Sequence, residues 1–517
     1  MTSKLVKQSL VTASLVTVGT NVFGRIFGYA REAAIAGHFG TSSTFDTFIL
    51  AFTVPEFMTF IIFAALPPAL IPLMRKNASE TQGERFRLFW EGLISFTIIF
   101  GLLSILIYLF REKILWCLAP NLTEQQRTIG ERLMTILSWF VFFRGVEAFF
   151  RSCLYDKKHF IVPATSPIIA NIIILVLIFS LYDELNIEAL AYGWLLASAA
   201  LFFYNGIFAF LLVKPTALSG VHLSSVKTLL RMTAALAIIA CIALIYPVID
   251  RYLAAKYLGE GQVAALRYAT FLAHIPPGMF VTAFAMASFP WISDLSVPEE
   301  TERLRRLYQN SLRFVIFVMA LVVAGMVTFS TEIVRIAFQR GAFDFTSLQL
   351  TESPFRIFSL GIIFYSVHLY QVRFYYAATT LLRLGAILTV MLIIKSIMSL
   401  ILVNPMEQDG LALATGIAWL SGCVIMTIDL GRSLKVSNWN VFTPYSLKVL
   451  LSVFGATLFW IVMSHVWPGT EVDSLMAVFI RLLLLTLGGI AVYIGMAVAL
   501  KLPEPKKMLM SLRSKTL

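Results

Sequence analysis

The chain has 517 residues, of which 58% are hydrophobic and only 14% are charged, and its mean hydropathy is +0.82. Soluble domains carry about 25% charged residues, so this composition excludes an ordinary soluble protein and predicts an all-α polytopic membrane protein. In a soluble protein the net charge of +12 would favour nucleic acid as a partner. Here it indicates basic loops on one side of a membrane, and we expect no nucleic-acid partner.

Membrane-length apolar segments follow one another along almost the whole chain. A transmembrane helix needs about 20 mainly apolar residues, and about fourteen segments meet this requirement. They are 9–36, 45–74, 89–110, 130–153, 160–182, 189–213, 229–249, 262–291, 312–331, 355–378, 384–403, 410–430, 446–466 and 475–500. The connecting loops are short, which leaves no room for a separate soluble domain.

The first segment carries two arginines, Arg25 and Arg31, beside Gly24 and Gly28. A charge at bilayer depth costs at least about 2.5 kcal/mol on the insertion scale, so we expect both arginines to line a cavity that binds an anion. The glycines would allow close packing or local unwinding of the helix. The alternative for Arg31 is that it snorkels to the outer interface or pairs with Glu32.

The second segment contributes two acids. Asp46 begins the segment near the outer end, where Arg31 also lies. It is either a counter-charge that holds Arg31 or an ordinary helix N-cap. Glu56 lies in the middle of the segment, where a glutamate is either paired or a proton carrier.

Two later segments carry the remaining candidates. In the fourth, Arg144 shares a helix face with Glu147 and Arg151, which is consistent with a structural ion-pair triad or with a ligand site. Arg267 and His274 flank the eighth, whose Pro276-Pro277-Gly278 predicts a broken helix. Broken helices often build transport sites, although a single histidine in a span is more often packed than functional.

Basic residues predict the orientation. They concentrate in alternate loops and in the C-terminal tail, whereas the loops near Asp183-Glu184, Glu407-Asp409 and Glu471-Asp473 have no lysine or arginine. The positive-inside rule then places both termini in the cytoplasm.

An internal repeat predicts the domains. Three pairs of similar stretches recur about 220 residues apart: Glu84-Arg85 with Glu302-Arg303, Ala189-Leu190-Ala191 with Ala412-Leu413-Ala414, and Arg151 with Arg373. Six spans per repeat give two parallel six-helix lobes, as in alternating-access transporters. We expect lobes at 1–220 and 221–440, with two extra helices and a basic tail at 441–517.

The arginine segment resembles the opening of the MurJ/MviN family of lipid II flippases, members of the multidrug/oligosaccharidyl-lipid/polysaccharide exporter superfamily. The similar stretches are Gly24–Glu32, Phe39-Gly40, Phe45-Asp46, Ala51–Pro55, Tyr268-Ala269 with Pro276 and Gly278, and Phe338–Phe343. The resemblance implies a V-shaped bundle whose central cationic cavity takes the diphosphate and sugars. The polyprenyl tail would lie in a groove made by the two last helices. Arg25, Arg31 and Asp46 carry over as substrate-binding residues.

The chain departs from the family pattern at two places. The family has a basic pair where this chain has Thr59 and Phe60, and an Asp-Arg followed by a Glu where it has Thr270, Phe271 and His274. Arg267, one turn before Phe271, and Arg144 are the candidates to supply the missing positive charge.

These features together predict a bacterial inner-membrane flippase for an undecaprenyl-diphosphate-linked saccharide, first of all the peptidoglycan precursor lipid II. Its partners would be that lipid, membrane lipids and cell-envelope glycan synthesis enzymes. The sequence has no phosphate loop, no metal-type His/Cys spacing and no GxSxG, so we predict no enzyme, no cofactor and no metal. The alternatives are a flippase for another lipid-linked glycan, such as an exopolysaccharide unit, and a drug or cation antiporter of the same superfamily.

Overall fold

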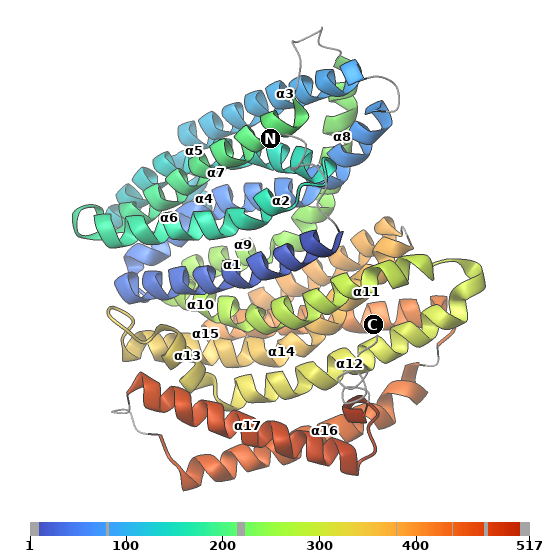
Figure 1. The fold of residues 1–517 in the computed structure, drawn as a ribbon. Helices are drawn as coiled ribbons and strands as arrows, with labels where there is room; N and C mark the ends of the chain where they lie inside the picture. The colour runs from blue at the N-terminus through green and yellow to red at the C-terminus, as the bar shows by residue number, and fades with distance from the viewer. Residues whose placement is uncertain are drawn as a thin grey trace. The chain divides into compact units, whose positions relative to one another are not determined.

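The computed structural model describes residues 10–78, 82–214, 223–378, 380–436, 438–469 and 474–506. Helices joined by short turns make up these residues (Figure 1). The predicted outer loop at Glu471-Asp473 and the basic tail from Lys507 lie outside the described residues. The prediction of an all-helical membrane protein is confirmed.

The helices pack into two compact units. The first is Met1–Ala264 with Arg340–Phe343, and the second is Ala265–Gln339 with Asp344–Leu517. The predicted lobe boundaries at 220 and 440 rest on the sequence repeat, and they stay a prediction.

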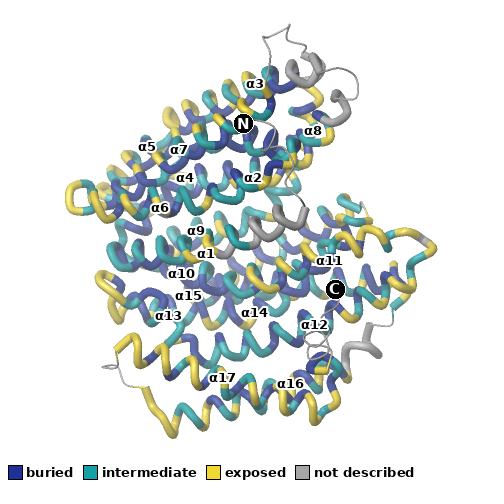
Figure 2. The backbone as a smooth tube through the Cα atoms, viewed as in Figure 1, coloured by how far each residue is buried: buried dark blue, intermediate teal, exposed yellow. Residues whose placement is uncertain are grey.

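The first unit is built around α5, which packs against α2, α3 and α7. Its buried residues run along most of the helix (Figure 2), as expected of a span enclosed by other spans. The helices of this unit are α1 (Leu10–Phe39), α2 (Ser43–Ala78), α3 (Gln82–Leu109), α4 (Arg111–Leu118), α5 (Glu124–Asp156), α6 (Ile161–Leu185), α7 (Ile187–Val213), α8 (Leu223–Leu244) and α9 (Tyr246–Tyr257).

One of the buried clusters of the second unit forms where Phe317 packs against Tyr493. The Tyr493 hydroxyl donates to the Phe317 carbonyl at 2.9 Å. Helix α10 (Gln262–Pro276) begins just before this unit. The other elements are a π turn (Pro277–Val281), α11 (Thr282–Asp294), a 3-10 turn (Pro298–Glu300), α12 (Thr301–Thr328), α13 (Ser330–Phe338), α14 (Phe345–Ala377), α15 (Leu381–Ser433), α16 (Asn438–Val466) and α17 (Leu475–Ala499).

Every predicted apolar segment overlaps a helix. Twelve helices within the described residues are long and apolar enough to cross a membrane. α1 covers the predicted segment 9–36, and α15 contains two predicted segments, 384–403 and 410–430, separated by the non-helical residue Glu407 (φ 51°). The number of membrane crossings stays a prediction.

The predicted break in the eighth segment is wrong. α10 continues into α11 through the π turn, in which the Thr282 N–H bonds to the Pro277 carbonyl. Proline has no N–H to donate, and the wider i→i+5 turn absorbs this loss without interrupting the helical path.

Candidate functional site

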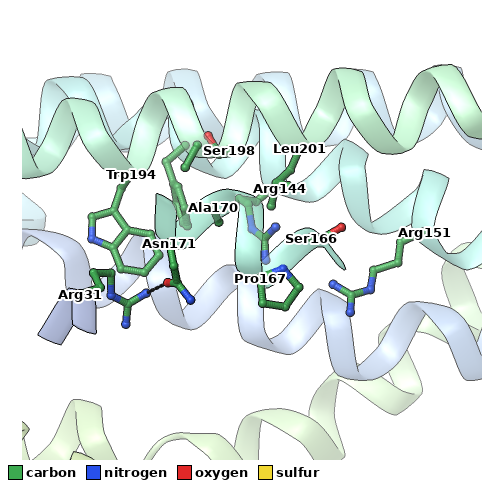
Figure 3. A pocket seen from close by; sticks show the side chains of 12 residues that line it. Arg31, Arg144, Arg151, Ser166, Pro167, Ala170, Asn171, Trp194, Ser198 and Leu201 are labelled. Carbon is green, nitrogen blue, oxygen red and sulfur yellow. Dashed lines mark hydrogen bonds between the residues drawn. The ribbon is translucent and has the colours of Figure 1, made fainter. Parts of the chain in front are cut away.

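A cavity of about 200 Å³ lies within the first unit, between α1, α5, α6 and α7 (Figure 3). Three arginines dominate its polar lining, which consists of Arg31, Phe140, Arg144, Arg151, Ser166, Pro167, Ala170, Asn171, Trp194, Ala197, Ser198 and Leu201. Pockets that hold a whole small ligand measure about 300–1,000 Å³. The cavity is therefore suited to one anionic group of a larger molecule.

Arg31 is fixed at one end of the cavity by α6, α7 and its own helix (Figure 3). Its Nη1 donates to Asn171 Oδ1 at 2.8 Å, and its Nη2 donates to Glu32 Oε1 at 2.6 Å. The guanidinium also lies over the ring of Trp194, 4.8 Å from its centroid. Its Nε is buried and has no acceptor among the described residues, which is unfavourable for the folded protein.

Two glycines of α1 lie against α6. A Cβ added at Gly24 would lie 3.6 Å from Pro167, and one added at Gly28 would lie 3.5 Å from the Asn171 amide nitrogen. That amide nitrogen donates to the Gly24 carbonyl at 3.3 Å. Both Cβ distances are ordinary contacts, so the packing of α1 on α6 leaves room for a methyl group at these positions, and α1 stays helical through them.

Arg144 lies in the middle of the row of arginines in Figure 3 and is held by a buried glutamate. Its Nη1 donates to Glu147 Oε2 at 2.6 Å, and the Glu147 side chain is 0% exposed. The other carboxylate oxygen accepts from Asn205 Nδ2 at 3.1 Å, and Asn205 also contacts Ser166 Oγ. The guanidinium lies 4.3 Å from the centroid of the Phe63 ring.

Arg151 lies at the far end of the row (Figure 3). Its Nε donates to the neutral Tyr155 hydroxyl at 3.1 Å, and it does not pair with Glu147 as the predicted triad required. Three arginines thus face two glutamates, Glu32 and Glu147, which leaves the cavity with a net positive charge. Guanidinium forks suit phosphate and stay protonated.

Arg25 lies on the same helix as Arg31 but does not line this cavity, and it is exposed. Its predicted role in substrate binding stays a prediction. Asp46 accepts backbone hydrogen bonds from Gly261 (2.6 Å) and Ala264 (2.7 Å), at the start of α10. The predicted pair between Asp46 and Arg31 is not formed, because Asp46 caps a helix and Arg31 pairs with Glu32.

Glu56 is paired rather than isolated. Arg251 of α9 donates to Glu56 Oε2 at 2.8 Å and to Thr53 Oγ1 at 3.2 Å. Arg251 was not among the predicted residues, because it lies outside the apolar core of the predicted spans.

In the second unit, His274 is packed among aromatic rings. Its ring centroid lies 5.0 Å from that of Tyr365 and 5.5 Å from that of Trp419, and its Nδ1 contacts the Thr270 carbonyl at 2.8 Å. Arg267, on the same helix, is half-buried. Substrate roles for both residues stay predictions.

Neutral side chains that were not among the predicted residues orient the arginines and their glutamate partners, namely Asn171, Trp194 and Asn205. Amides within apolar segments are themselves uncommon, so Asn171 and Asn205 were visible signals in the sequence. Nothing in the sequence distinguishes Trp194 from an interfacial tryptophan.

The chain is similar to known proteins along most of its length. A family model described as lipid II flippase MurJ matches residues 35–482. The probable lipid II flippase MurJ of Rhizobium tropici is 25% identical over 485 residues, which cover 89% of this chain and 88% of that protein. The lipid II flippase MurJ of Thermosipho africanus is 25% identical over 462 residues, covering 86% and 90%.

Solved structures show the same fold. A lipid II flippase MurJ in an inward closed conformation has a TM-score of 0.79 at 22% identity and covers 93% of this chain and 98% of that one. An inward-facing multidrug resistance MATE family transporter has a TM-score of 0.67 at 14% identity, covering 80% and 94%. The resemblance seen in the arginine segment is confirmed by the family model, which spans most of the sequence, and the chain belongs to the lipid II flippase MurJ family.

Proposed function

We propose that this protein translocates lipid II, an undecaprenyl-diphosphate-linked saccharide, across the bacterial cytoplasmic membrane by alternating access. The observation that carries the proposal is membership of the lipid II flippase MurJ family over residues 35–482. The arginine-lined cavity of the first unit supports it, because a diphosphate is the anionic group of such a lipid.

The role proposed for the cavity follows from its contacts. Arg31 is already oriented by Asn171 and Trp194, so little side-chain entropy remains to be lost when a phosphate oxygen binds. Arg31 and Arg151 line the cavity, and Arg151 is hydrogen-bonded to a neutral hydroxyl and not to a carboxylate, so an anion would engage the Arg151 guanidinium first. No covalent bond changes in this function.

Orientation and driving force belong to the same proposal. The basic loops favour an orientation with both termini in the cytoplasm, and the headgroup would then enter from that side. The candidate driving forces are a coupled ion and the membrane potential, since moving one charge across 100 mV is worth about 2.3 kcal/mol. Cell-envelope glycan synthesis enzymes would supply the substrate and use the product.

The test is mass spectrometry of membrane lipids after depletion of the protein, with variants supplied from a second copy. Lipid II should accumulate on depletion, and wild type should reverse this while Arg31→Ala should not. Arg111→Ala, which alters a partly exposed arginine of α4 outside the cavity, is the matched control and should behave as wild type.

Other outcomes identify the alternatives. Accumulation of a different polyprenyl-diphosphate glycan would replace lipid II as the substrate. No accumulated lipid, together with normal growth of cells carrying Arg31→Glu, would favour a cation antiporter, since reversal of a charge that lines the cavity should abolish movement of a diphosphate.

A further inference from the structure

A second cavity, of about 500 Å³, opens on the surface of the first unit where α5 meets α7. Its lining is entirely apolar and rich in aromatic rings: Phe150 of α5 with Phe202, Phe203, Gly206, Ile207, Phe210 and Leu211 of α7. We call it the aromatic groove. A Cβ at Gly206 would lie 3.1 Å from the Phe150 ring, so the glycine gives the groove its depth.

The aromatic groove faces the surroundings of the protein. Phe203 is 59% exposed and Leu211 is 60% exposed, yet both belong to a candidate membrane span. A groove at this position meets the hydrocarbon of the bilayer, so its occupant is a hydrocarbon chain. The groove lies in the last turns of α7, and the ring of Trp90 lies 5.8 Å from that of Phe210, as expected close to a membrane interface.

Two lysines follow the helices that form the groove. Lys158 comes after α5 and Lys214 caps α7, and both have a left-handed backbone, with φ of 58° and 47°. Glycine or asparagine normally occupies this position, because a Cβ is unfavourable there. Lys435 and Lys501, after α15 and α17 of the second unit, adopt the same conformation.

The helix dipole alone does not explain these lysines. A lysine in the last helical turn would interact with the dipole equally well, and its backbone would not need to be left-handed. Neither Lys158 nor Lys214 pairs with a carboxylate among the described residues, and both are exposed. His159, next to Lys158, contacts Phe208 of α7, with ring centroids 6.3 Å apart. The loop after α5 therefore brings Lys158 close to α7, the helix that Lys214 caps.

We propose that the aromatic groove, Lys158 and Lys214 form a binding site for an anionic phospholipid of the bulk membrane. One acyl chain fills the groove, and the phosphate lies at the two ammonium groups. The site is separate from the arginine-lined cavity, and the proposal does not depend on lipid II transport.

The experiment uses the full-length protein in nanodiscs that contain phosphatidylglycerol or phosphatidylcholine carrying a photoreactive acyl chain at equal mole fraction. Cross-linked peptides are mapped by mass spectrometry. Phosphatidylglycerol should label residues 202–211 in preference to phosphatidylcholine. Lys158→Gly and Lys214→Gly should each reduce this preference about fivefold, the equivalent of about 1 kcal/mol per lysine, without lowering the melting temperature, because glycine suits the backbone.

Two further variants complete the design. Ile207→Trp fills the groove from an exposed position and should abolish the label at 202–211. Lys435→Gly makes the same backbone and charge change in the second unit and should leave that label unchanged. Equal labelling by the two lipids, or an unchanged preference in Lys214→Gly, would overturn the proposal. Displacement of the label by undecaprenyl diphosphate at low mole fraction would overturn it in favour of a substrate-tail site.

Discussion

The arginines of the cavity are positioned by contacts within the protein. Arg31 and Arg144 each pair with a buried glutamate at 2.6 Å. Such pairs orient charge well, but they add little net stability, because desolvation of both ions offsets their attraction. The glutamates also moderate the positive charge, so an anion would bind without being trapped.

Removing one member of the second pair should therefore be more harmful than removing both. Arg144→Ala leaves Glu147 buried and uncompensated, and we expect a loss of about 3 kcal/mol of stability. The double variant Arg144→Met with Glu147→Leu should recover most of that loss while transport stays defective. Unfolding in detergent measures the first effect, and complementation measures the second. Equal stability of the single and double variants would contradict the buried-pair argument.

His159, in the turn between α5 and α6, gives a pH dependence. Burial lowers the pKa of this imidazole below its usual value, and its Nδ1 has no partner among the described residues. The unfolded chain then binds more protons than the folded protein, so stability is fully present above about pH 6.5. It should decline as the pH falls toward the folded-state pKa. His159→Phe should flatten this acid limb in melting curves recorded from pH 7.5 to 5.0, and an unchanged limb would assign it to other groups.

At the scale of single residues, the sequence identified charges that need a polar environment, but not which of them would be buried or what they would contact. The cost of a bilayer charge applied equally to Arg31 and Arg144, which line the cavity, and to Arg25, which is exposed. The direction of Arg25 and the partners of Asp46 depend on which helices pack together, which is not a local property. The same holds for Arg251, which pairs with Glu56 across 195 positions of sequence.

Among the helices, the packing of α1 on α6 decides the geometry of the cavity. The Asn171 side chain passes close to Gly28, where an added Cβ would lie 3.5 Å from its amide nitrogen, and it reaches Arg31 at 2.8 Å. A methyl group at 3.5 Å is an ordinary contact, and alanine favours a helix over glycine by up to about 1 kcal/mol. A longer side chain would displace Asn171.

A series at Gly28 tests this contact. Gly28→Ala should keep or raise stability and keep transport. Gly28→Leu should cost about 1–3 kcal/mol through overpacking and abolish transport by releasing Arg31. Gly19→Leu is the matched control, because a Cβ at Gly19 has nothing within 4 Å. Normal transport by Gly28→Leu would contradict the role of this packing.

Long helices were predictable because a span of about 20 apolar residues has few alternatives in a membrane. The short helices α4, α9 and α13 were not predicted, since they have 8, 12 and 9 residues and a search for transmembrane helices requires about 20. The π turn at Pro277 was also missed. A proline within a helix predicts a lost backbone hydrogen bond. Whether the helix then breaks or widens depends on the elements packed around it.

For the whole molecule, the remaining question is the direction of the chain through the membrane. Basic residues concentrate in alternate loops, and the loops near Asp183-Glu184, Glu407-Asp409 and Glu471-Asp473 have no lysine or arginine. The rule that basic loops stay cytoplasmic predicts that the N-terminus is inside. Helix α3 would then run outward, and α4, which follows it, would lie at the outer surface.

The native cysteines provide the test. Cys117 of α4 is exposed, Cys153 is buried, and Cys241 and Cys423 lie within spans and are only partly exposed. A membrane-impermeant maleimide should label the wild-type protein in intact spheroplasts at Cys117, and Cys117→Ser should remove the label. Lys158→Cys in that background should react only after permeabilisation, because it follows α5 on the opposite side. The opposite result is labelling of Lys158→Cys in intact spheroplasts and no labelling of Cys117 in the wild-type protein. It would reverse the orientation and with it the direction proposed for the lipid.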